Sequence, residues 1–163
     1  MTLPSNDPIR SSTDDVVQSR FAPHGRVEMR FEDDILFYDA TGPFNIELVE
    51  SLVIAQRDIL MAASPQRPWV SVSIMRRSML ASPDAFARYT EMMHTARSAQ
   101  FTPLASAYVV APDVEGRSLM LPKYEAIHIA SGRVFQSFTQ LDDALAWARS
   151  LIDAQTKASP NRS

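Results

Sequence analysis

Two adjacent arginines and two serines stand between an apolar segment and a predicted helix. Arg76 and Arg77 follow the segment 69–75, Ser78 comes next, and Ser82 precedes a proline. Guanidinium groups bind carboxylates and phosphates through paired hydrogen bonds, and the first N–H groups of a helix favour a nearby anion. We therefore expect Arg76, Arg77, Ser78 and Ser82 to form a binding site for an acidic partner or an anion. The alternative is that the arginines are solvated in a loop and that Ser82 only caps the helix.

Residues typical of catalytic and metal sites are few. The chain of 163 residues has no cysteine, which excludes thiolate nucleophiles and Cys-based metal sites, and three histidines, His24, His94 and His128. His94 and His128 lie on different predicted helices without the spacing of a metal site, and we expect both at or near the surface. No GxSxG elbow or glycine-rich phosphate loop is present. We therefore predict no cofactor, no metal and no enzymatic activity. A cleft that joins a histidine to a serine or a carboxylate would change that prediction.

Four large apolar or aromatic side chains suggest a second kind of site. Met79 lies just after the two arginines, Phe86 and Met93 lie on the helix that follows, and Tyr124 lies on a later helix. Methionine adapts its shape to irregular apolar surfaces. These four residues would line a connected apolar pocket for a small ligand or lipid. The alternative is that they are ordinary core residues.

Hydrophobic periodicity predicts five strands and four helices. Strands are expected at 27–31, 35–40, 69–75, 104–110 and 134–138, and helices at 46–61, 83–99, within 117–130 and at 141–152. The alternation of strands and helices favours a single α/β domain. We predict a mostly parallel mixed sheet of about five strands, opened by a β-hairpin, with about four helices mainly on one face.

The strand 69–75 has two different faces. Val70 and Val72 alternate with Ser71 and Ser73. A strand covered by helices on both faces usually reads as a nearly continuous apolar run. We therefore expect helices on the valine face. The serine face is expected to be open or lightly covered, so that two copies of the chain could form a homodimer through it.

The two ends of the chain are polar. We predict disordered tails at 1–24 and 154–163 and a folded domain at 25–153. No apolar run approaches the roughly 18 residues of a membrane span, and the N-terminal residues lack the apolar part of a signal peptide. We therefore expect a cytoplasmic protein. The net charge of −3 argues against a nucleic-acid partner.

Gly42 precedes the first predicted helix, and Phe138, Ala144 and Trp147 belong to the closing strand and helix. With these residues and its opening hairpin, the chain resembles the SpoIIAA-like group of the STAS/SEC14 superfamily over about residues 26–153. The resemblance implies a small cytoplasmic α/β domain without a known catalytic set. Anti-sigma-factor antagonists of the STAS type carry a phosphorylatable serine in an Asp-Ser-Ser/Thr-Gly-like motif. The matching segment here, MRRSMLASPDAF, has serines but no Asp before the first of them and no Gly after it.

These observations lead to two functional predictions. The first is a non-catalytic STAS/SpoIIAA-like regulatory or protein-interaction module that contacts an unknown protein partner. The alternative is a binding domain of the SEC14-like type for a small apolar ligand or lipid, because SEC14-type relatives bind apolar ligands between sheet and helices.

Overall fold

The computed structural model describes residues 7–16 and 22–159. Within them, a six-stranded sheet has the strand order β1-β2-β3-β4-β5-β6. The strands are β1 Ile9–Ser12, β2 Arg26–Glu32, β3 Ile35–Thr41, β4 Val70–Arg76, β5 Ala105–Val110 and β6 Val134–Phe138. The α-helices are α1 Ile46–Ala63, α2 Pro83–His94, α3 Arg117–Ala130 and α4 Leu141–Ala158, with short 3-10 helices η1 Thr13–Asp15 and η2 Ala99–Phe101.

The sheet is antiparallel at one side and parallel at the other. β1, β2 and β3 pair antiparallel, whereas β3, β4, β5 and β6 pair parallel. The β2–β3 hairpin turns at Asp33 and Asp34, which have φ angles of 50° and 62°. Two successive positive φ angles belong to the turn that matches the twist of a two-residue hairpin, and aspartate tolerates them better than most residues. The predicted single α/β domain with an opening hairpin and mixed sheet is confirmed.

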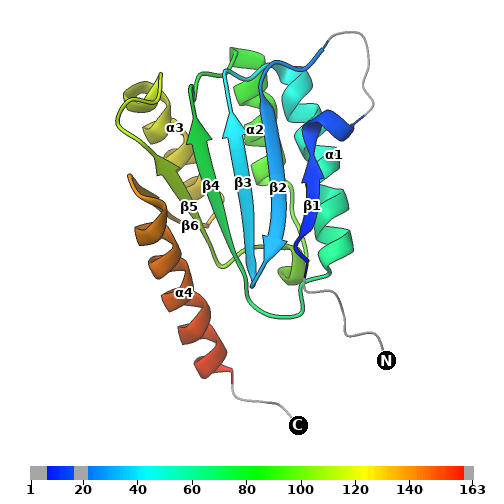
Figure 1. The fold of residues 1–163 in the computed structure, drawn as a ribbon, viewed down its shortest axis with the longest axis vertical. Helices are drawn as coiled ribbons and strands as arrows, with labels where there is room; N and C mark the ends of the chain where they lie inside the picture. Colours follow the sequence, from blue (N-terminus) through cyan, green and yellow to red (C-terminus); the bar gives the residue numbers. More distant parts are fainter. Residues whose placement is uncertain (1–6, 17–21, 160–163) are drawn as a thin grey trace.

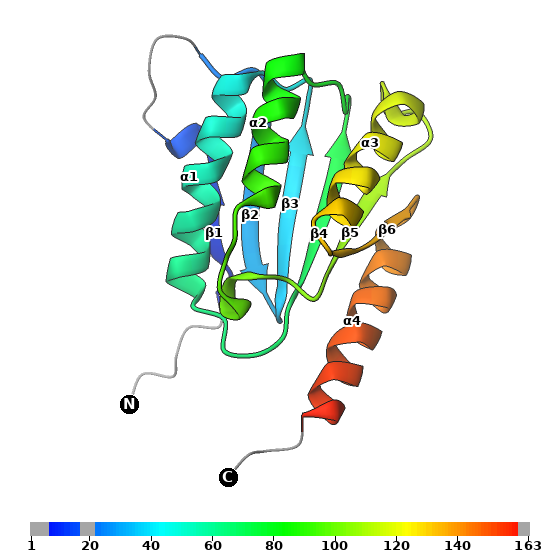
Figure 2. The ribbon, with the colours of Figure 1, turned by 180° about the vertical axis from the view of Figure 1, so that it is seen from behind.

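Three helices cover one face of the sheet and one helix covers the other. Figure 2 shows α1, α2 and α3 side by side in front of the strands. In Figure 1 the sheet lies in front of these three helices. The core is accordingly divided into two clusters. A large cluster lies between the sheet and α1 to α3, and a smaller one lies between the sheet and α4.

The prediction about the two faces of β4 is wrong. Val70 and Val72 point to α4, packing near Ala144 and Ala148. Ser71 and Ser73 point to the opposite face, beneath the three helices, where both line a cavity. The small polar residues mark a space inside the protein rather than contact with solvent.

The predicted tails also need correction. Residues 9–12 form β1, which pairs antiparallel with β2. Immediately after it, Thr13 is buried and its hydroxyl oxygen accepts a hydrogen bond from the Val27 amide at 3.0 Å. The sheet therefore has six strands rather than five. At the other end, α4 continues through residues 154–158 as an exposed helical extension, which has no apolar periodicity to predict it. Residues 1–6, 17–21 and 160–163 of the predicted tails lie outside the described residues.

Two features behind the predicted resemblance have structural reasons. A side chain at Gly42 would collide with the carbonyl oxygen of Ser78, so the close approach of these two loops requires glycine. Ala144 is completely buried against the sheet, and Trp147 packs on Phe138 with ring centroids 5.6 Å apart. These residues fix how α4 follows β6.

Candidate functional site

The arginine pair predicted as an anion site is divided by the fold. The guanidinium group of Arg76 is held by the carboxylate of Asp39, with Nε–Oδ1 at 2.6 Å and Nη2–Oδ2 at 3.0 Å. This hydrogen-bonded pair raises the pKa of Arg76 above its ordinary value. Arg77 is exposed, with a φ angle of 62°, and its side chain makes no hydrogen bond or ion pair with the described residues. Only Arg77 is therefore available to an external anion.

The two serines at this junction have structural partners. Ser78 is buried, and its hydroxyl donates to the Glu115 carboxylate at 2.9 Å while accepting from the Leu80 amide at 3.1 Å. Ser82 caps α2, accepting from the Ala85 amide at 3.4 Å and contacting Asp84 Oδ1 at 2.5 Å. The four predicted residues are thus neighbours in sequence without converging on one site.

The residues predicted to line an apolar pocket are likewise only partly together. Met93 and Tyr124 line the cavity beneath the helices. Met79 is completely buried, and Phe86 packs edge-on against Tyr124 with ring centroids 5.6 Å apart. Neither Met79 nor Phe86 reaches the cavity wall.

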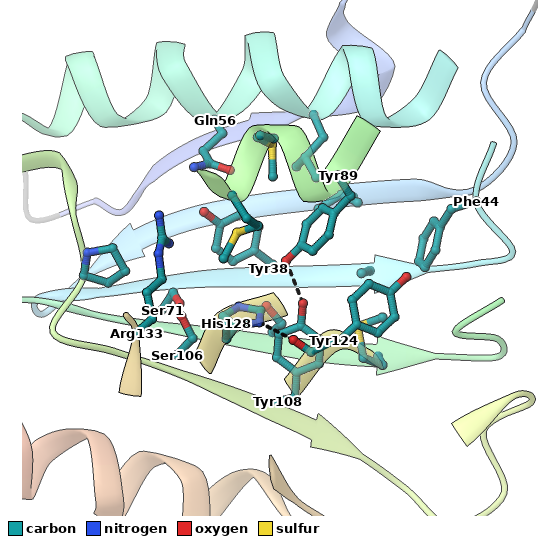
Figure 3. A pocket seen from close by; sticks show the side chains of 18 of the residues that line it. Tyr38, Phe44, Gln56, Ser71, Tyr89, Ser106, Tyr108, Tyr124, His128 and Arg133 are labelled. Atoms are coloured by element: carbon teal, nitrogen blue, oxygen red, sulfur yellow. Dashed lines mark hydrogen bonds between the residues drawn. The ribbon is translucent and has the colours of Figure 1, made fainter. Parts of the chain in front are cut away.

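That cavity has a volume of about 90 Å³ and lies between the sheet and α1, α2 and α3. Its floor comes from β2 to β5, including Ser71, Ser73 and Ser106, and its roof includes Leu52 and Met92 from the helices. Figure 3 shows Arg133, Ser71 and Ser106 toward one end, the tyrosines and His128 in the middle, and Phe44 at the other end. One end is thus polar and cationic and the other is apolar.

All four tyrosines of the chain line this cavity: Tyr38, Tyr89, Tyr108 and Tyr124. The hydroxyls of Tyr89 and Tyr108 are hydrogen-bonded at 2.9 Å, whereas the Tyr38 hydroxyl has no hydrogen bond to a described residue. Burial raises the pKa of each of the four above the ordinary phenol value. They remain protonated near neutral pH, so their hydroxyls can donate hydrogen bonds.

His128 is the only histidine among the cavity-lining residues that the structure describes. It is 3% exposed, which corrects the prediction that it lies at or near the surface. Its Nδ1 lies 2.7 Å from the Tyr124 carbonyl oxygen and therefore donates to it. Burial lowers the pKa of His128 to about 4, so the ring is neutral at pH 7. His94, in contrast, is exposed and contacts the Thr90 carbonyl oxygen at 2.8 Å.

Two arginines that the sequence reasoning did not single out, Arg97 and Arg133, also line the cavity. Arg97 follows α2, and Arg133 lies immediately before β6. Each is half-buried. When the Gln56 amide is turned so that its oxygen faces Arg97, this oxygen accepts hydrogen bonds from both terminal guanidinium nitrogens of Arg97. Arg97 additionally lines an outer groove, formed with Val53, Leu60 and Phe101, and so stands between the groove and the cavity.

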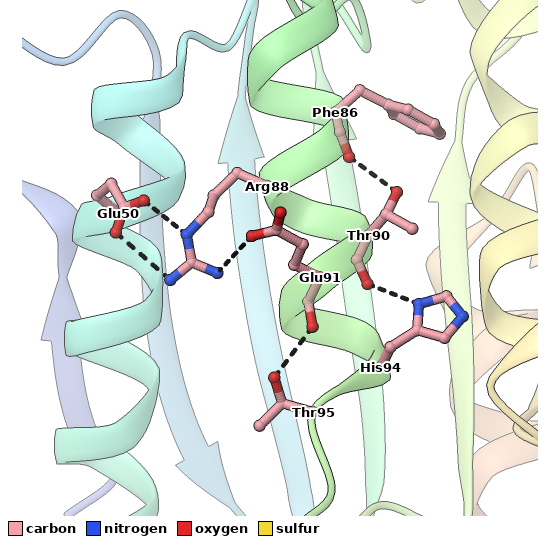
Figure 4. A network of polar contacts seen from close by, with 7 residues as sticks. All are labelled: Glu50, Phe86, Arg88, Thr90, Glu91, His94 and Thr95. Carbon is pink, nitrogen blue, oxygen red and sulfur yellow. Dashed lines mark hydrogen bonds and ion pairs between the residues drawn. The ribbon is translucent and has the colours of Figure 1, made fainter.

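A salt bridge holds the helical roof together. Arg88 on α2 contacts Glu50 on α1, with Nε–Oε1 at 2.6 Å, and its Nη1 lies 3.8 Å from Glu91 (Figure 4). This contact joins the two helices that carry Gln56, Met92 and Met93 over the sheet.

The positions of the cavity arginines follow from topology. In a parallel sheet, the connections that lead from each helix into the next strand meet at the amino edge. Arg97 lies on the connection from α2 to β5 and Arg133 on the connection from α3 to β6. The predicted alternation of strands and helices is therefore enough to place both arginines at the amino edge of the sheet. This edge lies opposite the carboxyl edge, where α/β sheets usually bind ligands.

No protein-family model and no curated protein matches the sequence. A solved structure is similar: the crystal structure of an uncharacterized protein of the DUF3478 family with a SpoIIAA-like fold from Shewanella loihica PV-4. The two share 13% identity with a TM-score of 0.50, and the match covers 81% of this chain and 99% of that chain. At this identity the likeness shows the fold alone. The chain has a SpoIIAA-like fold, which confirms the fold predicted from its sequence.

Among residues 7–16 and 22–159, no cluster of three or more His, Asp or Glu side chains could hold a metal ion. No helix within the same ranges has both the length and the apolar character needed to cross a bilayer.

Proposed function

We propose that this protein is a non-catalytic binding module of SpoIIAA-like fold that receives a small molecule in the cavity beneath α1, α2 and α3. The proposal rests on the set of side chains that line this cavity. It gathers all four tyrosines, a buried neutral histidine and two half-buried arginines around apolar walls. Ligand sites typically combine apolar walls with a few convergent polar groups in this way.

The hydrogen bonds of the cavity support binding rather than catalysis. His128 donates from Nδ1 to a backbone carbonyl, not to a carboxylate that would raise its basicity. Ser71 and Ser106 are hydrogen-bonded to each other at 2.8 Å, and neither is paired with His128. None of the described residues that line the cavity is acidic. The arrangement lacks the nucleophile–base contact on which acyl transfer depends.

A cavity-filling substitution tests this proposal. Ser73 faces the cavity and makes no side-chain hydrogen bond with the described residues, so Ser73→Leu would fill the space without stranding a polar partner. We expect some members of a set of neutral and charged probes, including butanol, butanamide and butanoate, to shift amide resonances around the cavity in the wild-type protein. Ser73→Leu should abolish these shifts.

Ser150→Leu, a matched change on the exposed side of α4, should leave the probe responses intact. Equal responses in Ser73→Leu and the wild type, or no response to any probe in the wild type, would contradict the proposal.

A second role, contact with a partner protein at the carboxyl edge of the sheet, is supported by Arg77. This arginine is exposed and unpaired among the described residues, whereas neighbouring Arg76 is engaged by Asp39. Arg77→Glu should therefore weaken recovery of a partner that carries an acidic surface in pull-down experiments. Unchanged recovery would exclude this edge as the contact site.

A further inference from the structure

The two cavity arginines have no carboxylate partner among the residues that the structure describes. None of the ion pairs formed by the described residues includes Arg97 or Arg133. Arg88, nine positions before Arg97, is by contrast paired with two carboxylates, those of Glu50 and Glu91. For the Arg97 side chain, the described residues supply only the neutral amide of Gln56 as a hydrogen-bond partner.

The positive charges of Arg97 and Arg133 affect the same part of the cavity. Burial lowers the pKa of Arg133, and the positive charge of Arg97 lowers it further. Both charges also act on the Tyr38 hydroxyl, which has no hydrogen bond to a described residue. Like charges that are partly removed from water without a counter-ion are unfavourable. An anion placed between them would relieve this repulsion.

The remaining walls decide what kind of anion fits. Leu52, Met92 and Met93 present apolar surface to the cavity, whereas the Ser71 hydroxyl donates a hydrogen bond to the Ser106 oxygen. The cavity, of about 90 Å³, has room for a small organic ligand. A fully hydrated phosphate would leave the apolar wall unused. A carboxylate with a short alkyl group matches both the charge and the wall.

Resting on the proposed function, we propose that the ligand is a short-chain monocarboxylate. Its carboxylate lies between Arg97 and Arg133, within reach of the Tyr38 hydroxyl. Its alkyl group packs against the leucine and methionine side chains of the helical roof. Arginine suits this task because its planar donors match the two carboxylate oxygens.

The experiment compares two probes of nearly equal shape. Butanoate and butanamide are titrated separately into the isotopically labelled 163-residue protein, and amide shifts at the cavity residues give the dissociation constants. Butanoate should bind at least about tenfold more tightly, because hydrogen bonds to charged groups are worth more than those to neutral ones. Equal affinities would overturn the inference while leaving the proposed function standing, because the cavity would still bind a small molecule.

Inorganic phosphate is the third probe. Phosphate should displace butanoate weakly or not at all, because it gains nothing from the apolar wall. If phosphate binds in the cavity and butanoate does not, the assignment of the ligand as a carboxylate is overturned. A response to butanol and butanamide but not to butanoate would overturn it as well.

Substitutions locate the carboxylate. Arg133→Gln and Arg97→Gln should each remove most of the preference for butanoate over butanamide. Arg10→Gln removes the same charge from β1, away from the cavity lining, and should preserve the preference. A preference retained in both cavity variants would overturn the inference. If a cavity variant does not fold, the affinities of butanoate and butanamide for the wild-type protein still test the inference.

Discussion

The spacing of residues along α3 explains why the His128 side chain is buried. It lies four positions after Tyr124, so both side chains point to the same face of the helix, toward the sheet. The sequence showed this spacing but gave no reason to prefer burial of a histidine over exposure. The deciding contact is the hydrogen bond from Nδ1 to the Tyr124 carbonyl, which satisfies one ring nitrogen inside the protein.

This burial predicts a dependence of stability on pH. The pKa of His128 is about 4 in the folded protein, against 6.5 for an unperturbed histidine. Between these values the unfolded chain binds the proton more readily, so the free energy of unfolding falls as the pH is lowered from 6.5 toward 4. The shift corresponds to a loss of about 3 kcal/mol by pH 4.

Urea unfolding of the wild type and of His128→Asn at several pH values measures this contribution. The difference in stability between the two should shrink as the pH falls through this window. His94→Asn, at an exposed position of α2, is the control and should follow the wild type. A constant difference from pH 7 to pH 4 would show that His128 is not the group responsible.

Ser78 illustrates the opposite outcome for a predicted site residue. Its place after the arginines resembles that of a switch serine, but its hydroxyl faces Glu115 inside the protein. A phosphate here would meet a carboxylate and would have to leave the interior. The sequence could not show this, because Glu115 is 37 positions away.

At the scale of elements, the strands and helices with regular hydrophobic periodicity were predictable, whereas a short strand that depends on its partner strand was not. The alternation in β2 and the helical spacing in α4 are evident in the sequence. β1 has only four residues and no apolar alternation, and its place depends on pairing with β2 and on the buried Thr13 that follows it. Such support is not visible until the partner strand is in place.

The packing of α4 gives a prediction at this scale. Ala144 is completely buried against the sheet, in a cluster with Val72 and Ala107. Ala144→Leu adds methylene groups where no space exists and should lower the free energy of unfolding by about 1 to 3 kcal/mol. Ala154→Leu, on the exposed end of the same helix, should change it by less than about 0.5 kcal/mol. Urea unfolding measures both, and equal effects would refute the described packing of α4.

At the scale of the whole molecule, the sheet was predictable from the sequence, but the face that most helices cover was not. Ser71 and Ser73 suggested a face in contact with water or with a second copy of the chain. The fold places three helices over that face instead, and the small side chains leave the space that the tyrosines and arginines surround. Polarity on a strand can therefore indicate an internal cavity as well as solvent. Only the arrangement of the covering helices distinguishes the two.

The short strand β1 has a consequence for how copies of the protein meet one another. It occupies the outer edge of β2, where its backbone groups satisfy those that would otherwise face solvent. An uncovered strand edge is a template on which strands of other molecules can add. A chain that begins at Thr13 should therefore self-associate as its concentration rises, which light scattering would detect. The scattering of the 163-residue chain should rise less over the same concentrations. We therefore expect β1 to limit aggregation, because it covers the edge of β2.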